Sequence, residues 1–396
     1  MNRPADALTI QRLTTEEGFS RLRGRWNALL EASSADHYFL RWEWLSTWWD
    51  AYKTSRDRLC ILLLLRGEDL VGIAPFYVTN QSWKNIFKVR RLLFLGTTQE
   101  SLVSEYMNII CRPGEEEAVV KRVINEVVQE DLCDDLSLHN IVTTSQTLPL
   151  LKKASEARQF LCNTSCEMES PYIHLPSSWE EFLSGCRPSL RHQIRSQQKK
   201  LFRYPAVSFR KTRDLSELER DFKEFVRLHQ QRWEARRLPG SFAEGRFPLF
   251  QRRMAASMLE KGHLELKFLS IQGKNVAALY NIRYKDRVYY YQSGMDLSFD
   301  PTLAPGLLLH AHAIEEAIRD GMKEYDFLMR GSGDSYKKRW TGEYRTLCSI
   351  YLARPGIVKI VELIRNKARA IRSFAKASAE RPKLISTILK RGEAIR

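Results

Sequence analysis

The chain has 396 residues and a formal net charge of +16 at pH 7. Hydrophobic residues make up 43% and aromatic residues 11%, which excludes wholesale disorder and allows two domains, each with its own core. The longest apolar run, 60–65, is too short to span a bilayer, and the N-terminus lacks the apolar region of a secretory signal. We therefore expect a soluble, cytoplasmic protein.

The N-terminal half shows helical and strand periods in alternation, which predicts an α/β fold. A hairpin is predicted where two aliphatic runs flank the turn residues Gly67, Glu68 and Asp69. The other expected strands are 8–13, 92–95, 106–111 and 136–141, and the expected helices are 19–30, 39–52, 115–130 and 148–158.

A domain junction is expected near 171–178, where the run SPYIHLPSS breaks the pattern. A helix is predicted after it, with Pro188 in the first turn. Ser216 and Glu219 have the spacing of a capping box, so a second helix is expected to run from there through Trp233.

The stretch from 263 to 340 carries the most information. Three strands are predicted from HLELKFLSI, VAALYNIRY and RVYYYQSG, and a helix follows Pro305-Gly306 and ends at Gly321. A helix that begins after a Pro-Gly turn leaves its first backbone N–H groups free, and these groups suit a pyrophosphate. The hairpin around Gly273 resembles the one around Gly67, which favours a tandem duplication.

Two segments carry the excess positive charge. Residues 187–213 contain nine Lys or Arg and no acid, and residues 354–396 contain twelve Lys or Arg and three Glu. A uniformly basic surface would indicate general nucleic-acid binding, whereas two local segments need separate explanations. The seven cysteines include no Cys-x-x-Cys pair, so we expect reduced thiols and no metal site.

Several of these motifs resemble those of a known family. The matching residues are Trp233 to Arg236, Ser293 to Asp296, Pro305 to Leu309, Gly321 to Leu328, and Tyr336 to Trp340. Over roughly 170–355 the chain is similar to the GNAT superfamily, and within it to the CelD-like acetyltransferases, which are related to the Fem-type aminoacyl transferases. The loop 300–306 departs from the superfamily pattern because it keeps a single glycine.

The resemblance implies a fold, a donor and a reaction. The expected fold class is α/β with tandem GNAT-like domains, each a mixed, mainly antiparallel sheet flanked by helices. The expected limits are 1–170 for the N-terminal domain, 171–355 for the catalytic domain and 356–396 for a basic amphipathic tail. The donor is acetyl-CoA or another acyl-CoA, and the backbone near Pro305, Gly306, Leu307 and Leu308 is expected to hold its pyrophosphate.

Three residues are the catalytic candidates. Lys337 is expected to stabilise the oxyanion that forms when a thioester is attacked. Asp326, in a predicted strand, either accepts a proton from the attacking amine or hydroxyl, or pairs with Lys337, Arg330 or Arg339 and only fixes the turn. Tyr336 is the candidate acid that protonates the leaving thiolate, with the tyrosines at 289–291 as rivals.

An acceptor site is predicted from arginines that can bind carboxylates or phosphates and from an indole that can stack on a sugar. The alternative is an amphipathic helix with a solvated basic face. His310 and His312 are expected to be packing residues. The predicted substrate-binding residues are Arg191, His229, Arg232, Trp233, Asp296 and Arg330, with Arg195 beside them.

The predicted function is transfer of an acetyl or short acyl group to an amine or hydroxyl of a polar acceptor, such as a saccharide or a cell-envelope or exopolysaccharide precursor. One alternative donor is aminoacyl-tRNA, although the basic segments lack the interleaved aromatics typical of nucleic-acid binding. Another alternative is a non-catalytic scaffold in polysaccharide assembly. The tail either lies on the anionic inner membrane surface, docks on its own domain or is disordered. The oligomeric state stays open.

Overall fold

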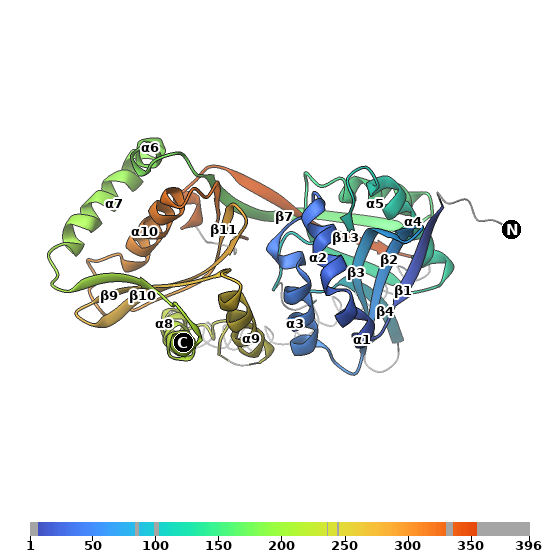
Figure 1. Cartoon of the computed structure of the whole chain (residues 1–396), viewed down its shortest axis with the longest axis horizontal. Coiled ribbons are helices and arrows are strands. Elements are labelled where there is room, and N and C mark those ends of the chain that lie inside the picture. Colours follow the sequence, from blue (N-terminus) through green and yellow to red (C-terminus); the bar gives the residue numbers. More distant parts are fainter. Residues whose placement is uncertain are drawn as a thin grey trace, which may run out of the picture.

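The strands of the chain form one mixed sheet that spans both halves. In the computed structural model it has 13 strands in the order β1-β2-β3-β4-β6-β13-β7-β12-β11-β10-β9-β8, with β5 paired to β3. Figure 1 shows the two halves side by side, joined by the long strands β7 and β13. The structure describes residues 7–83, 87–98, 103–235, 237–243, 245–329 and 336–354. The predicted tail, 356–396, lies outside the described residues.

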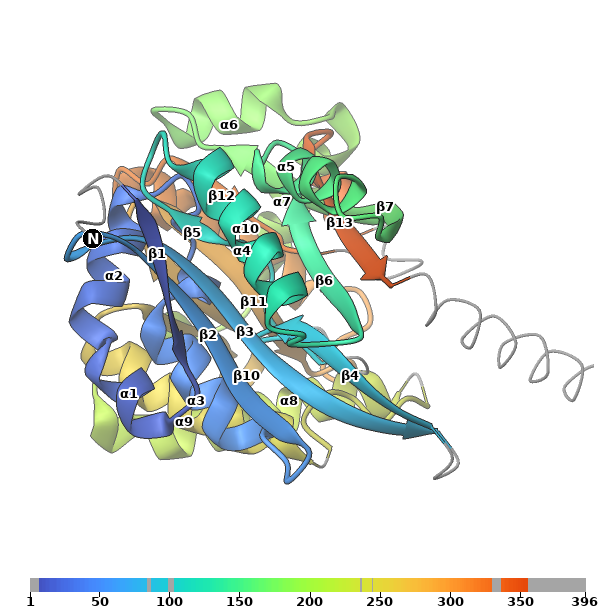
Figure 2. The same ribbon diagram turned by 90° about the vertical axis from the view of Figure 1, so that its right-hand side faces the viewer.

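The N-terminal half alternates strands and helices as its sequence predicts. Its elements are β1 (Leu8–Leu13), α1 (Glu16–Arg21), α2 (Arg23–Ala32), η1 (Tyr38–Leu40), α3 (Trp42–Tyr52), β2 (Asp57–Arg66), β3 (Asp69–Trp83), β4 (Phe87–Phe94), β5 (Ile110–Cys111), α4 (Glu116–Gln129), β6 (Asp135–Val142) and α5 (Thr147–Glu156). The predicted strand 106–111 is wrong except for β5. The predicted helix 19–30 is divided at Leu22, which caps α1 and precedes α2. In Figure 2, α4 and α5 lie across the face of this half that points toward the viewer.

The C-terminal half repeats that plan. Its elements are β7 (Leu161–His174), α6 (Trp179–Gly185), α7 (Pro188–Leu201), β8 (Val207–Lys211), α8 (Leu215–Glu234), α9 (Arg246–Glu260), β9 (Leu264–Ile271), β10 (Lys274–Tyr284), β11 (Arg287–Met295), α10 (Pro305–Arg319), β12 (Glu324–Asp326), η2 (Lys337–Arg339) and β13 (Tyr344–Ala353). Pro188 occupies the first turn of α7, as predicted. The predicted capping box of α8 is wrong, because Asp214 is the N-cap and accepts from the N–H groups of Ser216 and Glu217.

The two halves share one topology. In each, four strands pair antiparallel in chain order, a helix crosses over, and one further strand pairs parallel with the fourth. This helix is α4 between β4 and β6 in the N-terminal half, and α10 between β11 and β12 in the C-terminal half. The predicted fold class, α/β with a mixed, mainly antiparallel sheet flanked by helices in each half, is confirmed.

Strands β7 and β13 join the halves. The segment 161–171 of β7 pairs with β13, and 172–174 pairs with β12. β13 in turn pairs with β6, so the last described strand lies inside the sheet of the N-terminal half. The break predicted at 171–178 is therefore wrong for its first four residues. The limits 1–170 and 171–355 stay a prediction, and β7 runs across them.

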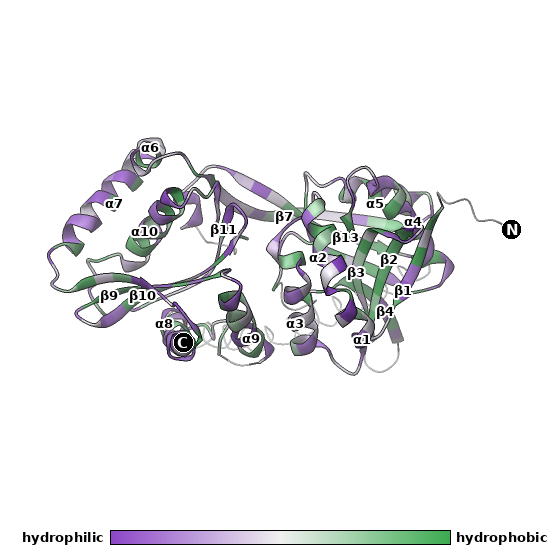
Figure 3. Ribbon diagram, in the orientation of Figure 1, coloured by the Kyte–Doolittle hydropathy of each residue, from purple (hydrophilic) through white to green (hydrophobic). Residues whose placement is uncertain are grey.

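Two hydrophobic cores hold the elements in place. One lies between α6, α7, α10 and one face of the β8–β12 sheet, and it includes Leu190, Ile194, Leu309 and Tyr325. The other covers the N-terminal half and continues under α8 and α9 on the opposite face. Helix α9 packs on α3 of the N-terminal half. In Figure 3 the hydrophobic residues colour the strands of the N-terminal half green, as expected of buried strands. No described helix is long and apolar enough to cross a membrane.

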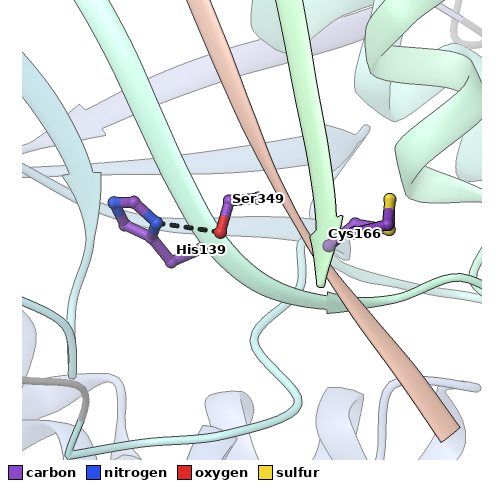
Figure 4. The surroundings of a disulfide bond; sticks show 4 residues. His139, Cys166 and Ser349 are labelled. Atoms are coloured by element: carbon purple, nitrogen blue, oxygen red, sulfur yellow. Dashed lines mark hydrogen bonds between the residues drawn. A yellow bond between two sulfur atoms is a disulfide. The ribbon is translucent and has the colours of Figure 1, made fainter. Parts of the chain in front are cut away.

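The expectation that all thiols are reduced is wrong. Cys166 of β7 and Cys348 of β13 form a disulfide, shown in Figure 4 near the hydrogen bond between His139 and Ser349. The two cysteines are 182 positions apart, and only the pairing of β7 with β13 brings them together. Spacing arguments detect motifs that are local in sequence, so they gave no sign of this pair. Cys60, Cys111, Cys133, Cys162 and Cys186 are free thiols.

Candidate active site

The parallel strands of the C-terminal half separate after a short contact. β11 and β12 pair only from Arg287/Glu324 to Tyr289/Asp326. Beyond that point β11 stays with β10, while the N–H of Phe327 turns to the carbonyl of Pro171 on β7. The opening between the strands is the place where side chains of both strands and of α10 meet.

The first turn of α10 supplies backbone donors at this opening. Pro305 and Gly306 begin the helix, and among the described residues no side chain caps it, so the N–H groups of Gly306 and Leu307 have no partner within the helix. The N–H of Leu308 already bonds Ala304 O at 3.1 Å, and the N–H of Ala304 donates to Gln197 Oε1 of α7 at 2.7 Å. The helix dipole adds positive potential here, so an anion is favoured.

A cavity of about 30 Å³ lies beside this turn. It has room for about one water molecule. Met295 narrows it, because a Cβ built on Gly306 would lie 2.8 Å from the Met295 Cε. Binding of a diphosphate at α10 therefore requires the flexible Met295 side chain to move. The cavity is lined by Arg232, Ala278, Leu279, Tyr290, Ser293, Gly294, Met295, Gly306, His310 and Tyr336.

Helix α8 places Arg232 at the cavity. The close packing of α8 on β11 depends on Gly294, since a Cβ at that position would lie 2.4 Å from the backbone nitrogen of His229. The Arg232 Nη1 donates to Ser293 Oγ at 2.7 Å, and the Tyr290 hydroxyl lies 2.6 Å from the same oxygen. The predicted residues Arg232, Gly306 and Tyr336 are thus brought together from three elements.

Asp326 ends β12 and is fully buried. Its Oδ2 accepts from the Tyr106 hydroxyl at 2.6 Å and from Arg345 Nη1 at 3.3 Å, and its Oδ1 accepts from the N–H of Leu328 at 2.7 Å. Burial raises the pKa of Asp326 to about 6, against the opposing charge of Arg345. The prediction that Asp326 points inward is confirmed. Its ion-pair partner is Arg345, not Lys337 or Arg339. Arg330, the third predicted partner, lies outside the described residues.

Glu105, which sequence analysis missed, lies next to this group. It comes from the N-terminal half, is buried, and its Oε2 accepts from the N–H of Met329 at 2.7 Å. Burial raises the pKa of Glu105, with Lys337 opposing and Asp326 adding to the rise. Two buried carboxyls with raised pKa values, one from each half, therefore interact electrostatically, and such a pair can hold and release a proton near neutral pH.

Lys337 does not point to bulk solvent. Its Nζ donates to the carbonyls of Phe327 at 2.6 Å, Leu328 at 3.2 Å and Met329 at 2.6 Å, and it lies 5.5 Å from the centre of the Tyr290 ring. An ammonium has three protons to donate, so these carbonyls can engage all of them. Lys337 therefore fixes the backbone that leaves β12, where Leu328 has a φ of 58°.

Aromatic rings fill the space around the cavity. His310 of α10 contacts the rings of Tyr290, Phe327, Tyr336 and Trp340. Burial lowers the pKa of His310 to about 3, which keeps the imidazole neutral and fits the predicted packing role. Burial also raises the pKa of the Tyr336 phenol, so this hydroxyl stays protonated as a proton donor must.

The predicted acceptor residues do not form one pocket. Arg191 lies on α7 and donates to Ser184 O, whereas His229 and Trp233 lie on α8, on the opposite face of the sheet, and bond each other at 3.0 Å. Burial lowers the pKa of His229 to about 4. Arg195 is on α7 with Arg191.

Asp296 acts as a turn cap. Its carboxylate accepts from the N–H of Ser298 at 2.9 Å and pairs with Lys274 at 2.7 Å. Burial acts to raise the pKa of Asp296, but these hydrogen bonds lower it to about 2. A carboxylate that is ionised and bonded in this way holds the loop that leads from β11 to α10.

Tyr106 is the second residue that the sequence did not reveal. Its hydroxyl bridges Asp326 and Ser170 Oγ, and its ring stacks on His37, whose pKa burial lowers to about 3. The available signal was a glutamate directly before the predicted strand 106–111, whose first residue is Tyr106. Within the described ranges, no three His, Cys, Asp or Glu side chains form a group that could hold a metal ion.

Comparison with known families identifies the domain. Residues 188–338 match the family model described as an acetyltransferase (GNAT) domain, so the C-terminal half carries a GNAT acyltransferase domain. Domains of this kind in general use an acyl-CoA donor. No curated protein sequence matches significantly.

Two solved structures show the same overall fold. A conserved protein of unknown function from Bacteroides thetaiotaomicron has 11% identity and a TM-score of 0.53, with 87% of this chain and 100% of that chain covered. FemX has 10% identity and a TM-score of 0.55, with 89% of this chain and 99% of that chain covered. At these identities the likeness concerns the fold alone, and it extends over both halves.

Proposed function

We propose that the protein transfers an acetyl or other short acyl group from an acyl-CoA to an amine or hydroxyl of a polar acceptor. The observation that carries the proposal is the uncapped first turn of α10, which opens on the cavity of Arg232 and Gly306 inside the segment that matches a GNAT domain. An acidic first turn would repel a pyrophosphate; this first turn has no acid, and the guanidinium of Arg232 lies at the same cavity.

The donor supplies an activated thioester, and the residues of the chain bind and orient it. The N–H groups of Gly306 and Leu307 are the proposed diphosphate donors, after Met295 has moved aside. Arg232 is fixed by Ser293, so its charge stays directed at the cavity when the site is empty. Such preorganisation lowers the cost of binding an anionic group.

The proton from the acceptor is proposed to pass to the carboxyl pair of Glu105 and Asp326. Both have pKa values raised by burial, which suits an acid–base group that works near neutral pH. Glu105 comes from the N-terminal half, so the acceptor is expected to enter between the halves. Tyr336, whose phenol stays protonated, is the proposed donor to the leaving thiolate.

The role of Lys337 changes from the one that the sequence suggested. Its ammonium donates to three backbone carbonyls, so it positions Phe327 to Met329 and with them the partner of Glu105. A direct bond to an oxyanion would require one of these bonds to break. We therefore assign Lys337 as a positioning residue.

The acceptor class follows from the polar groups around the opening and from the resemblance to CelD-like proteins. A saccharide or cell-envelope precursor, made in the cytoplasm, fits a site that offers both arginine and carboxyl groups. The alternative is an aminoacyl-tRNA donor of the Fem type, which the fold shared with FemX favours. The two donors differ in size and charge, so a binding experiment separates them.

Calorimetry with acetyl-CoA tests the proposal. Wild-type protein is expected to bind acetyl-CoA, and Arg232→Ala to bind it at least about 10-fold more weakly, because a charge-assisted contact is lost. Arg253→Ala, an exposed arginine outside the site, is the matched control. Release of free CoA thiol with amine- and hydroxyl-bearing sugars then identifies the acceptor. Absence of acetyl-CoA binding, together with binding of aminoacyl-tRNA, would overturn the acyl-CoA assignment.

A further inference from the structure

The outer face of helix α7 carries positive charge and an exposed aromatic side chain. Every third or fourth residue points outward: His192, Arg195, Lys199 and Phe202 are all exposed, and Phe202 is 86% exposed. The opposite face, with Leu190, Ile194 and Leu201 among others, is buried against the sheet. These four outward residues, together with Arg187, Arg191, Lys200 and Arg203, are called the α7 surface below.

The described part of the chain gives the cations of the α7 surface few anionic partners. Among the described residues, none of its arginines or lysines forms an ion pair with a carboxylate; Arg191 donates to Ser184 O and Lys200 to Thr302 O. Helix α8 shows the contrast, because its Lys223 and Arg227 pair with Glu219 and Glu224. Asp300 is one acid close to this surface: the Tyr204 hydroxyl donates to it, and this bond together with the nearby charge of Lys200 lowers the pKa of Asp300.

The shape of the α7 surface indicates a planar partner. A helix of 14 residues is about 21 Å long. The charges lie along one side of this rod, and Phe202 protrudes at its end. In Figure 1, α7 forms the outer margin of the C-terminal half, away from the N-terminal half, and Figure 3 colours it mainly hydrophilic. Nothing in the described chain covers it.

We propose that the α7 surface binds an anionic lipid bilayer, with its cations at the phosphate headgroups and Phe202 in the interfacial layer. Lysines and arginines near an anionic membrane each add to the attraction, and an exposed phenylalanine adds apolar burial. Single-stranded RNA fits less well, because a stacking platform needs several aromatic side chains and this surface has one. The inference does not depend on the acyl-transfer chemistry.

The inner side of α7 connects this surface to the candidate active site. Gln197 accepts from the N–H of Ala304 and donates to Thr302 O at 3.1 Å, and Lys200 donates to the same carbonyl. Both contacts hold the loop that leads into α10. A protein that rests on a bilayer through α7 would therefore keep the start of α10 close to the lipid headgroups.

Vesicle sedimentation of the full chain tests the proposal. Wild-type protein is expected to bind vesicles of phosphatidylglycerol and phosphatidylcholine but not of phosphatidylcholine alone, with binding that weakens as salt is raised. The triple variant Arg195→Glu/Lys199→Glu/Arg203→Glu is expected to bind at least about 100-fold more weakly. Phe202→Ser is expected to reduce binding about 5- to 20-fold, and Phe202→Trp to restore it.

A control triple, Lys121→Glu/Arg253→Glu/Lys323→Glu, changes the net charge by the same amount at exposed cations elsewhere and should leave binding within about 3-fold of wild type. Thermal melts of both triples check that they fold. Vesicle binding that is unchanged in the α7 triple would overturn the proposal and assign the membrane contact to another segment. Absence of binding to anionic vesicles, or salt-sensitive binding of a single-stranded RNA oligomer that the α7 triple loses, would overturn it as well.

Discussion

The N- and C-terminal halves build the same order of strands and a crossover helix, yet they fill the opening between their parallel strands in different ways. In the N-terminal half the segment 103–109 occupies it: Ser104 Oγ donates to Gly96 O beyond β4, and Asn140 of β6 donates to Ser104 O. In the C-terminal half β11 and β12 also separate, and among the described residues aromatic side chains line the gap.

The first turns of the two crossover helices, α4 and α10, also differ. The first residues of α4 are Glu116 and Glu117, and Glu116 accepts from the N–H of Gly114 at 2.8 Å, so the chain itself supplies an anion. The first residues of α10 are Pro305 and Gly306, with no acid and no cap. The helix start of the N-terminal half therefore repels an anion, and the inserted segment of that half carries Glu105 and Tyr106 to the other half. In the proposed function, one copy binds the donor and the other completes the site.

The largest effect is expected when the first turn of α10 is given an acid, as in α4. Gly306→Glu places an acid at the second helical position, where α4 has Glu117. Acetyl-CoA binding is expected to fall at least about 100-fold, because like charges are brought together. Calorimetry measures the change, and Glu117→Gly in α4 is the matched control that should leave donor binding unaltered. Gly306→Ala, whose Cβ meets only the flexible Met295, separates charge from crowding.

Glu105→Gln tests the contribution of the inserted segment. It keeps the acceptor for the Met329 N–H but loses the titrating carboxyl, and turnover is expected to fall about 100-fold or more. Because burial raises the pKa of Glu105 above its ordinary value of 4.5, the folded state holds this proton more tightly than the unfolded chain. Wild-type stability should therefore decline as pH rises above about 5.

Thermal melts at a series of pH values measure that decline. The variant should show a flatter profile, with the remaining slope between pH 4 and 6 due to Asp326, whose pKa burial raises to about 6. Glu117→Gln, at an exposed carboxyl, is the control. Equal slopes in wild type and Glu105→Gln would mean that Glu105 is ionised in the folded protein and does not work as proposed.

Lys337→Ala tests whether Lys337 positions the backbone that follows β12. Loss of the ammonium leaves the carbonyls of Phe327 and Met329 without their donor, so stability should fall by about 2–3 kcal/mol. Turnover is expected to drop about 100-fold through misplacement, with donor affinity nearly unchanged. Lys338→Ala, at the exposed neighbour, should change stability by less than about 0.5 kcal/mol. Full turnover in Lys337→Ala would remove this residue from the mechanism.

Tyr106→Phe is expected to have the smallest effect. It removes the hydroxyl that joins Asp326 to Ser170 and keeps the ring on His37, so the cost is about 1–2 kcal/mol. Denaturant unfolding measures it, and Tyr344→Phe, at an exposed tyrosine, is the control. A variant as stable as wild type would show that this hydroxyl does not hold the halves together.

Sequence patterns were sufficient where the signal is local. The periodicity of 263–294, the Pro-Gly start of α10 and Pro188 in α7 each placed an element within a few residues of its position. Asp326 was correctly directed inward, because alternation along a strand fixes which face a side chain takes. Arg232 and Gly306 were both named, and the structure brings them to one cavity.

Contacts between distant segments were not accessible in this way. The partner of Asp326 is Tyr106, 220 positions away, and the disulfide joins residues 182 positions apart. Arg191 and His229 were both predicted to bind the acceptor, but their helices lie on opposite faces of the sheet. A strand was predicted at 106–111, but only Ile110 and Cys111 form one; the residues before them lie between strands, where Asn140 of β6 donates to Ser104 O.

The place of β13 has a consequence for how the chain is made. Strand β13 lies between β6 and β7, so the sheet of the N-terminal half stays open until residues 344–353 have left the ribosome. Until then β6 and β7 present unpaired edges, which are sites of wrong association. The two halves therefore cannot mature one after the other, and the nascent polypeptide completes this sheet only after residues 344–353 have been made.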